Sequence, residues 1–381
     1  MSGVTIAVGQ SAREVVPAEL DAAPHQHWAE LRENRPVACA PALGLTLLTR
    51  HEAVRAVCED ETRFSAETPD GPLTRTLGPN FMHSDGELHL AVRRALAPAL
   101  RGGTVRSQHE SWMRKRTRQL LGELADGGDV MAGLAFPLAA EAVSRISGVL
   151  ASPSQWQQWF EGLAAGVGNF EDDPVKRDSA EACSDQIGEA VTRAARADAG
   201  LVGVLTRAGF PAAVVLSTVK LLVIGGVQEP RDLSGFAVWG LVGSRQWADV
   251  AADRSLLPAA IEEAARWGSP VGTVTRTTTR DVRLDGVTLP AGTAVGAVLA
   301  SANRDPRRWT DPDRYDARRD EGSHLAYGAG PHLCIGAAMA RVLVRVLLDE
   351  MLDIRPGLSL ANTPVATGWE FCTPGAVEVT G

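Results

Sequence analysis

His324-Leu325-Ala326-Tyr327-Gly328-Ala329-Gly330-Pro331-His332-Leu333-Cys334-Ile335-Gly336 is the most informative stretch of the chain. Three glycines surround one cysteine, Cys334, and the run at 337–344 predicts a helix that begins directly after them. Glycine accepts positive φ and has no Cβ, so such a loop bends tightly and can approach a flat cofactor closely. The free N–H groups and the positive dipole end of the following helix favour a thiolate at Cys334.

The residues alone leave three interpretations of Cys334 open. A lone cysteine is most often a small buried hydrophobic residue. A zinc site is a second interpretation, with His324, His332 and Cys334 as ligands, although the chain offers no second cysteine pair at metal spacing. The third is a thiolate under haem, where the sulfur pushes electron density onto the iron and favours O–O cleavage.

The loop resembles the haem-binding signature of the cytochromes P450, Phe-x-x-Gly-x-x-x-Cys-x-Gly. Tyr327, Gly330, Cys334 and Gly336 stand at its four positions, and Tyr327 keeps an aromatic ring where the family has Phe. The resemblance implies haem b as the cofactor, Cys334 as the iron ligand, and Tyr327, Gly328 and Gly336 beside the cofactor.

Two further segments resemble motifs of the same family. Ile261-Glu262-Glu263-Ala264-Ala265-Arg266-Trp267 resembles its Glu-x-x-Arg helix, and the i, i+3 spacing places Glu263 and Arg266 on one helical face. Tyr315-Asp316-Ala317-Arg318-Arg319 resembles the segment that supplies a second arginine, here Arg319. The resemblance implies a buried network behind the cysteine loop; an ordinary surface ion pair, which contributes little, is the alternative.

The haem propionates have candidate partners in three places. His89 and Arg93 lie at i, i+4 in a segment similar to the family's C-helix, so they share a helical face. Arg276 stands where the resemblance places another propionate ligand, and His332 is a fourth candidate. Guanidinium groups suit carboxylate geometry. A solvated basic helix face is the alternative, and we favour it for Arg94 and Arg101.

The predicted helix at 210–245 contains an unusual version of the family's oxygen-binding motif. The family has Ala/Gly-Gly-x-Asp/Glu-Thr, whereas this chain has Gly225-Gly226-Val227-Gln228-Glu229-Pro230. Pro230 removes an N–H and opens the helical ladder. The resemblance implies that Gly225 and Gly226 make space for dioxygen and that Gln228 and Glu229 organise protons. Alternatively, Glu229 anchors a substrate group, or pairs with Arg231 and only stabilises the kink.

Substrate contacts are expected in four regions where pockets of this family vary. For each of these residues a core or surface position is at least as plausible an interpretation. The candidates are Leu77, Phe81, Met82, Val167, Phe170, Val271, Thr273, Trp369 and Phe371.

Composition bounds the class of protein without deciding it. The chain has 381 residues, 45% of them hydrophobic, which supports a sizeable core. A net charge of −8 argues against generic nucleic-acid binding. Five dispersed cysteines fit a reducing cytosol. The N-terminus has no signal-peptide pattern and no long apolar run, so we expect a cytoplasmic protein that does not insert in a membrane.

The resemblance covers nearly the whole chain. It implies a mainly α fold with small β-sheets, as a loose N-terminal segment (1–20) followed by a single cytochrome P450 domain (21–381). Strand patterns are predicted near 44–49, 273–289 and 294–298.

The implied function is a haem-thiolate monooxygenase of secondary metabolism. It would oxidise a small organic molecule, by hydroxylation or O-dealkylation, with O₂ and with electrons from a separate ferredoxin and ferredoxin reductase. A basic patch for that donor is expected from Arg93, Arg94, Arg101, Arg341 and Arg345. Alternatives are a peroxygenase, an enzyme of oxidative coupling or desaturation, and a non-catalytic haem-binding sensor.

Overall fold

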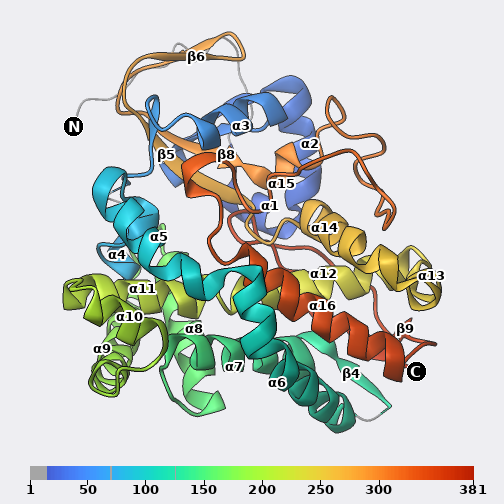
Figure 1. The fold of residues 1–381 in the computed structure, drawn as a ribbon. Helices are drawn as coiled ribbons and strands as arrows, with labels where there is room; N and C mark the ends of the chain where they lie inside the picture. The colour runs from blue at the N-terminus through green and yellow to red at the C-terminus, as the bar shows by residue number, and fades with distance from the viewer. Residues whose placement is uncertain (1–14, 69–70, 125) are drawn as a thin grey trace.

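The chain folds into a mainly helical structure with small β-sheets, as expected (Figure 1). The computed structural model describes residues 15–68, 71–124 and 126–381. The α-helices are α1 (Pro17–Ala22), α2 (Pro24–Asn34), α3 (His51–Glu59), α4 (Pro72–Leu77), α5 (Gly86–Leu100), α6 (Gly102–Glu123), α7 (Phe136–Ser147), α8 (Pro153–Val167), α9 (Pro174–Arg196), α10 (Gly200–Arg207), α11 (Ala212–Gly225), α12 (Gln228–Gly243), α13 (Trp247–Ala252), α14 (Leu257–Gly268), α15 (Leu299–Ala302) and α16 (Ala337–Ile354). Short 3₁₀ or π turns are η1 (Pro41–Leu43), η2 (Phe81–His83), η3 (Met131–Ala135), η4 (Arg254–Leu256) and η5 (Gly330–His332).

The strands form three small sheets. They are β1 (Val37–Ala40), β2 (Leu45–Leu48), β3 (Phe64–Ser65), β4 (Gly127–Asp129), β5 (Thr273–Thr278), β6 (Val282–Leu284), β7 (Val287–Leu289), β8 (Ala294–Val298), β9 (Ser359–Leu360) and β10 (Glu378–Thr380). The largest sheet has the order β1-β2-β8-β5-β3, with β2 and β8 parallel and the other pairs antiparallel. The predicted strand regions all contain strands of this sheet or of the β6–β7 hairpin.

A long apolar helix crosses the middle of the molecule as α11 and α12 (Figure 1). By hydropathy and length, Ala212–Gly243 is the one stretch among the described residues that could span a membrane. Half of its window is buried by protein, however, and its two parts pack against α7, α8, α9, α14 and α16. This burial on several sides is typical of a core helix.

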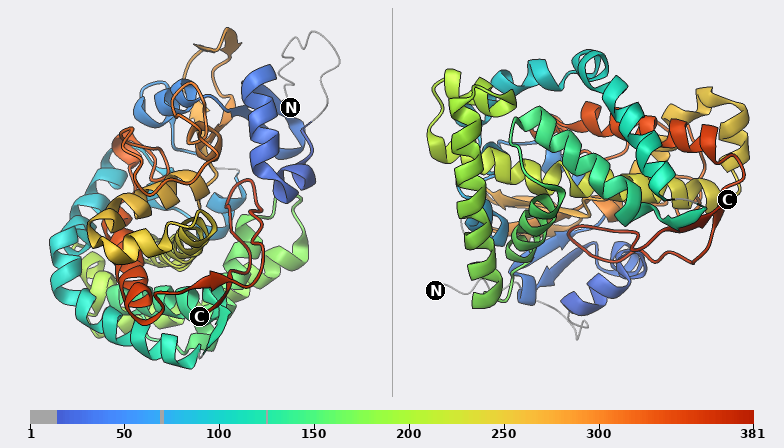
Figure 2. Two further views of the ribbon diagram at one scale, coloured as in Figure 1. Left: turned by 90° about the vertical axis from the view of Figure 1, so that its right-hand side faces the viewer. Right: turned by 90° about the horizontal axis from the view of Figure 1, so that it is seen from below.

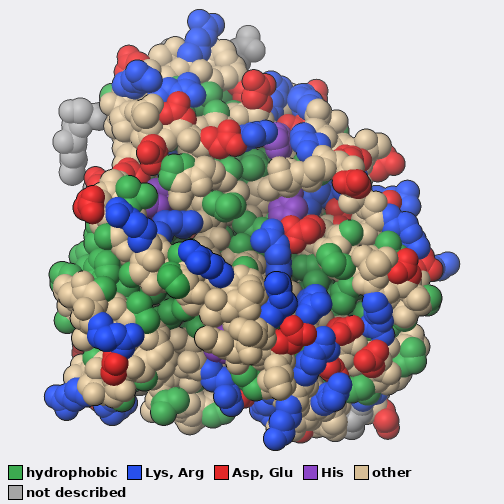
Figure 3. Space-filling view, in the orientation of Figure 1, with side chains coloured by type: hydrophobic (Ala, Val, Ile, Leu, Met, Phe, Trp, Pro, Cys, Tyr) green, Lys and Arg blue, Asp and Glu red, His purple; other side chains and the backbone are tan. Residues whose placement is uncertain are grey.

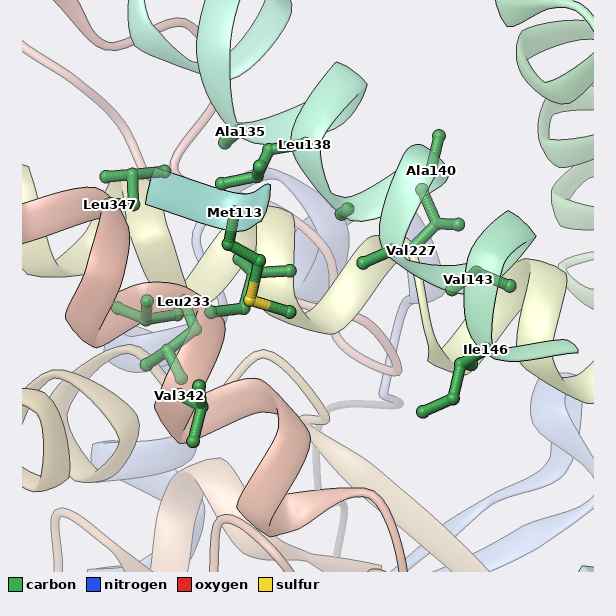
Figure 4. Close-up of a cluster of buried hydrophobic side chains, with 14 of the residues drawn as sticks. Met113, Ala135, Leu138, Ala140, Val143, Ile146, Val227, Leu233, Val342 and Leu347 are labelled. Atoms are coloured by element: carbon green, nitrogen blue, oxygen red, sulfur yellow. The ribbon is translucent and has the colours of Figure 1, made fainter. Parts of the chain in front are cut away.

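The main core lies where α6, η3, α7, α12 and α16 meet. Figure 4 shows side chains from these elements pointing toward one another, including Met113 of α6, Leu138 of α7, Leu233 of α12 and Leu347 of α16. All four side chains are almost completely buried. Burial of each contributes about 1.5–3 kcal/mol, and the shared core fixes α16, which begins directly after the cysteine loop, against α12.

A loop near the C-terminus closes on the first helices of the described chain. The Gly368 N–H donates to the Asp21 carbonyl, and the C-terminal loop lies beside α1 and α2 (Figure 2). Most of the expected loose segment 1–20 lies outside the described residues. Its last part already belongs to α1, where Leu20 is buried in a hydrophobic cluster that includes Trp28 and Leu31 of α2.

Candidate active site

The cysteine loop is held in shape by two left-handed glycines and one long-range contact. Gly328 and Gly330 have φ of +70° and +66°. A Cβ on Gly330 would lie 2.7 Å from the carbonyl oxygen of Cys58 in α3, so only glycine fits between the loop and that helix. The Cys334 N–H donates to the Tyr327 carbonyl at 2.9 Å, which closes the loop just before α16. The backbone is therefore folded to present the Cys334 side chain from a fixed position.

Cys334 lines an open space inside the fold, called the enclosed space below. Its side chain is exposed although the atoms around it are dense enough to desolvate the thiol, which is expected where a side chain borders a hollow within the protein. It is therefore not the buried hydrophobic residue of the first interpretation. Zinc is also disfavoured, because no group of His, Cys, Asp and Glu in the described residues could hold a metal ion.

The pKa of the Cys334 thiol is shifted in the direction opposite to the expected one. Burial raises the pKa of Cys334, and the Gly336 backbone N–H, Arg93 and Arg341 lower it by less. The backbone N–H groups at the helix terminus act in the predicted direction, but desolvation of the thiol outweighs them. The protein surroundings therefore do not deprotonate Cys334 by themselves, whereas a bound metal ion deprotonates a coordinating thiol outright.

Glu263, Arg266 and Arg319 form a buried network. Arg266 donates to both oxygens of Glu263 at 2.7 and 2.8 Å, and Nε of Arg319 lies 3.1 Å from each. The Glu263 and Arg266 side chains are 2% and 1% exposed, so this is not a surface ion pair. Arg266 also donates to the Asn303 carbonyl at 2.7 Å, and Asn303 accepts the Leu325 N–H at 2.7 Å. The network thus reaches the first residues of the cysteine loop.

The central helix breaks between Gly225 and Gln228. Pro230 has no N–H, so the Gly226 carbonyl loses its i+4 donor and α12 starts as a separate helix. A Cβ on Gly226 would lie 2.6 Å from the Leu222 carbonyl oxygen, whereas the nearest atom to a Cβ on Gly225 is Oε2 of Glu229, at 3.5 Å. Gly225 and Glu229 therefore border the same space.

Glu229 is enclosed by protein and has a free oxygen. Its Oε2 atom is buried and has no hydrogen-bond partner in the described part of the chain. Desolvation raises the pKa of Glu229 to about 8, the neighbouring Asp232 raises it further, and Arg231 lowers it only slightly. The charge of Glu229 raises the pKa of Cys334 in turn, so the two groups lie within electrostatic range of each other.

The interpretation that Glu229 pairs with Arg231 is wrong. Arg231 donates instead to Asp232 Oδ1, from Nε at 2.9 Å and Nη2 at 2.8 Å. Sequence reasoning missed Asp232, although its position three residues after Glu229 places both acids on one face of α12.

Comparison with known proteins decides the family. A family model described as Cytochrome P450 matches residues 239–353. Cytochrome P450 monooxygenase PikC of Streptomyces venezuelae is 30% identical over 374 residues, which cover 91% of this chain and 87% of that one. Nocardicin C N-oxygenase of Nocardia uniformis subsp. tsuyamanensis is 31% identical over 381 residues, 93% of each chain.

The chain belongs to the cytochrome P450 family. Its fold matches that of P450BioI bound to a fatty-acid-loaded acyl carrier protein, with a TM-score of 0.87 at 24% identity over 96% of this chain and 100% of that one. The tirandamycin C-bound P450 monooxygenase TamI gives a TM-score of 0.85 at 27% identity, over 96% of this chain and 99% of that one. This P450 is therefore a monooxygenase by family, and its cofactor is haem.

The residues around the cysteine loop fit a dianionic group such as haem with its two propionates. Arg276 is 8% exposed and donates only to the neighbouring Thr275 carbonyl, at 2.7 Å. Arg93 is half-buried, and neither guanidinium forms an ion pair with a carboxylate of the described residues. Burial lowers the pKa of both. Because an unpaired buried charge is costly, two such guanidinium groups fit carboxylates supplied from outside the chain.

The two histidines of the predicted propionate set lie together but are already hydrogen-bonded. Their ring centroids are 3.9 Å apart. His89 Nδ1 lies 2.7 Å from the Phe81 carbonyl oxygen and Nε2 lies 3.1 Å from that of Pro331, so neither nitrogen is free. His332 Nε2 lies 3.1 Å from Asp85 Oδ1. Within the predicted propionate set, Arg93 and Arg276 are thus the cationic groups that have no carboxylate partner among the described residues.

The predicted substrate residues separate into buried and partly exposed positions. Leu77, Phe81, Val167, Thr273 and Trp369 are buried, and Thr273 Oγ1 donates to the Trp369 carbonyl at 3.2 Å. Phe170 packs on Trp369 with ring centroids 5.3 Å apart, and Phe371 pairs with Val271 in a β-bridge. The partly exposed candidates are Met82, Phe170, Val271 and Phe371.

The expected basic patch is partly neutralised by carboxylates. Arg341 donates to Glu262 at 2.6 and 2.8 Å, and Arg345 donates to Glu110 at 2.9 Å. Arg94 lies 3.8 Å from Glu87, and Arg101 is exposed. Figure 3 shows this face with Lys and Arg interspersed with Asp and Glu, so its net positive charge is smaller than the sequence indicates.

We expect Glu263→Ala to lower the free energy of unfolding by about 3–5 kcal/mol, because it leaves Arg266 buried without its anion. Glu189→Ala is the matched control, since its ion pair with Arg193 is 3.9 Å long and both side chains are largely exposed. That change should cost about 0–1 kcal/mol. Denaturant unfolding of the holoenzyme measures both, and equal losses would contradict a special role for the buried network.

Glu229 should make this P450 less stable as pH rises. Its folded pKa of about 8 lies above the ordinary 4.5, so the folded protein binds the proton more tightly than the unfolded chain. Stability relative to Glu229→Gln should therefore be full below pH 4.5 and decline until about pH 8. Thermal unfolding of both proteins across this range tests it; parallel pH curves would show that Glu229 titrates normally.

Proposed function

We propose that this P450 is a cytoplasmic haem-thiolate monooxygenase with Cys334 as the iron ligand. It would use O₂ and external electrons to oxidise a small organic molecule by hydroxylation or O-dealkylation. The observation that carries the proposal is that the exposed Cys334 side chain of the cysteine loop lies within electrostatic range of the enclosed Glu229 carboxyl of the central helix. Bound there, haem supplies dioxygen activation at iron.

The cysteine loop and the central helix have different roles at the enclosed space. The cysteine loop fixes the sulfur through the contact between Cys334 N–H and Tyr327 O, while Arg93 and Arg276 would hold the propionates. On the opposite side, Gly225 leaves room beside the helix break. Gln228 and Glu229 replace the acid–alcohol pair, and a carboxyl with a pKa of about 8 carries a proton at neutral pH and can deliver it.

The names of the relatives support a substrate from secondary metabolism. They include erythromycin C-12 hydroxylase of Saccharopolyspora erythraea, 30% identical, and mycinamicin IV hydroxylase/epoxidase of Micromonospora griseorubida, 29% identical. We propose a ferredoxin with its reductase as the electron source. Arg94 and Arg101 are the exposed members of the basic patch that hold no short ion pair, and they suit an acidic donor.

The reduced protein with carbon monoxide tests the ligand. We expect the red-shifted Soret band typical of a thiolate ligand, and Cys334→Ser should abolish it while the fold is retained. Circular dichroism is the control for folding. A histidine-type band that is the same in both proteins would sink the assignment of Cys334.

A second candidate function is peroxide-driven oxygenation, which the carboxyl at position 229 favours because it can act as an acid–base group for a peroxide as well. We expect Glu229→Gln to lower coupled turnover with ferredoxin and O₂ by about 10²-fold, with substrate affinity little changed. Product formed per NAD(P)H consumed, and turnover with hydrogen peroxide alone, are measured on both proteins. Full coupled turnover by the variant would exclude Glu229 as the proton donor.

A further inference from the structure

A second buried acid lies directly behind Glu229. Asp232 follows it by three residues on α12, its side chain is 0% exposed, and its Oδ2 atom has no hydrogen-bond partner in the described residues. Desolvation raises the pKa of Asp232 to about 6. Two buried carboxyls on one helical face, each with an unpartnered oxygen, are costly unless something binds between them.

The other oxygen of Asp232 is firmly held. Oδ1 accepts hydrogen bonds from Arg231 and, at 3.1 Å, from the Thr373 hydroxyl of the C-terminal loop. Buried Cys372 lies within electrostatic range on the same loop. These contacts fix the rotamer of Asp232. The Gln228 side chain also lies close enough to lower the pKa of Asp232, but Oδ2 has no close hydrogen-bond partner in the described residues and is the atom left to bind a further donor.

Arg231 connects Asp232 with the protein surface. Its side chain is 18% exposed and its guanidinium lies 5.2 Å from the centroid of the Phe160 ring of α8. Asp232 thus lies between a group that touches solvent and a carboxyl that borders the enclosed space. The Gly226 carbonyl, which Pro230 leaves without a helical donor, adds a third polar atom at the helix break.

We propose that Asp232 is a positioning residue for proton delivery, which holds ordered water between its Oδ2 atom and Glu229 Oε2. Two to four polar partners are what a buried water requires. After Glu229 gives its proton to the enclosed space, the Asp232 carboxylate takes a proton from solvent beside Arg231. The water then passes this proton from the Asp232 carboxyl to the Glu229 carboxylate, and Asp232 is an anion again. The inference rests on the proposed role of Glu229.

The test compares Asp232→Asn, Thr373→Val and Glu229→Gln in the holoenzyme. Infrared spectra of the protonated carboxyl groups, recorded against pH, assign each acid by the band that its own variant removes. In Asp232→Asn the pKa of Glu229 should fall, because the negative charge that raises it is gone. In Thr373→Val the pKa of Asp232 should rise, because the hydroxyl that stabilises its anion is lost.

Turnover gives the second readout. Asp232→Asn should slow coupled turnover on the order of tenfold, enlarge the solvent deuterium isotope effect and leave KM unchanged, and Asp232→Glu should restore part of the rate. Ser234→Ala is the matched control, because it removes a buried hydrogen bond of 2.7 Å to Pro230 from the same helix without removing an acid. It should change none of these quantities.

The outcomes separate the two proposals. If Glu229→Gln changes turnover but Asp232→Asn leaves the Glu229 titration and the isotope effect unaltered, Asp232 only anchors the C-terminal loop and the relay is wrong. If Glu229→Gln itself has no effect on coupling, the proposed role of Glu229 fails first.

Discussion

The Glu263 carboxylate is the interaction on which the haem side of the structure depends. It accepts hydrogen bonds from Arg266, Arg319 and the Asp316 N–H, and so joins α14 to the irregular segment that follows α15. Arg266 also holds the Asn303 carbonyl, and the Asn303 amide oxygen accepts the Leu325 N–H. The cysteine loop is therefore positioned by buried charge rather than by regular secondary structure.

The enclosed space has opposite electrostatic character on its two sides. Unpaired guanidinium groups lie near the cysteine loop, whereas Glu229 and Asp232 lie along the start of α12. Both sets are desolvated, and each would destabilise a protein that had nothing to place beside it. A cofactor with two carboxylates, together with bound water, offers counterparts for both.

Residues at fixed spacing predicted most of the site. The glycine–cysteine loop and the Glu-x-x-Arg pair are local patterns, and Pro230 removes an N–H from its helix. These features, including the helix break, could therefore be predicted from the sequence. Contacts between distant residues that belong to no motif were not predictable, in contrast to the contact of Arg319 with Glu263. Thr373 meets Asp232 across 141 positions, and Glu262 and Glu110 neutralise arginines that looked free in the sequence. Trp369, a substrate candidate, is buried in the cluster that includes Leu20 and Trp28, a contact that the sequence did not indicate.

The raised pKa of Cys334 has a consequence for how the enzyme matures. Desolvation favours the neutral thiol at Cys334, and a thiol reacts far more slowly than a thiolate with oxidants or disulfides. A metal binds the deprotonated sulfur, so coordination of iron has to release this proton. The desolvation that opposes a thiolate therefore also protects the sulfur from oxidation in folded protein that has not yet bound its cofactor.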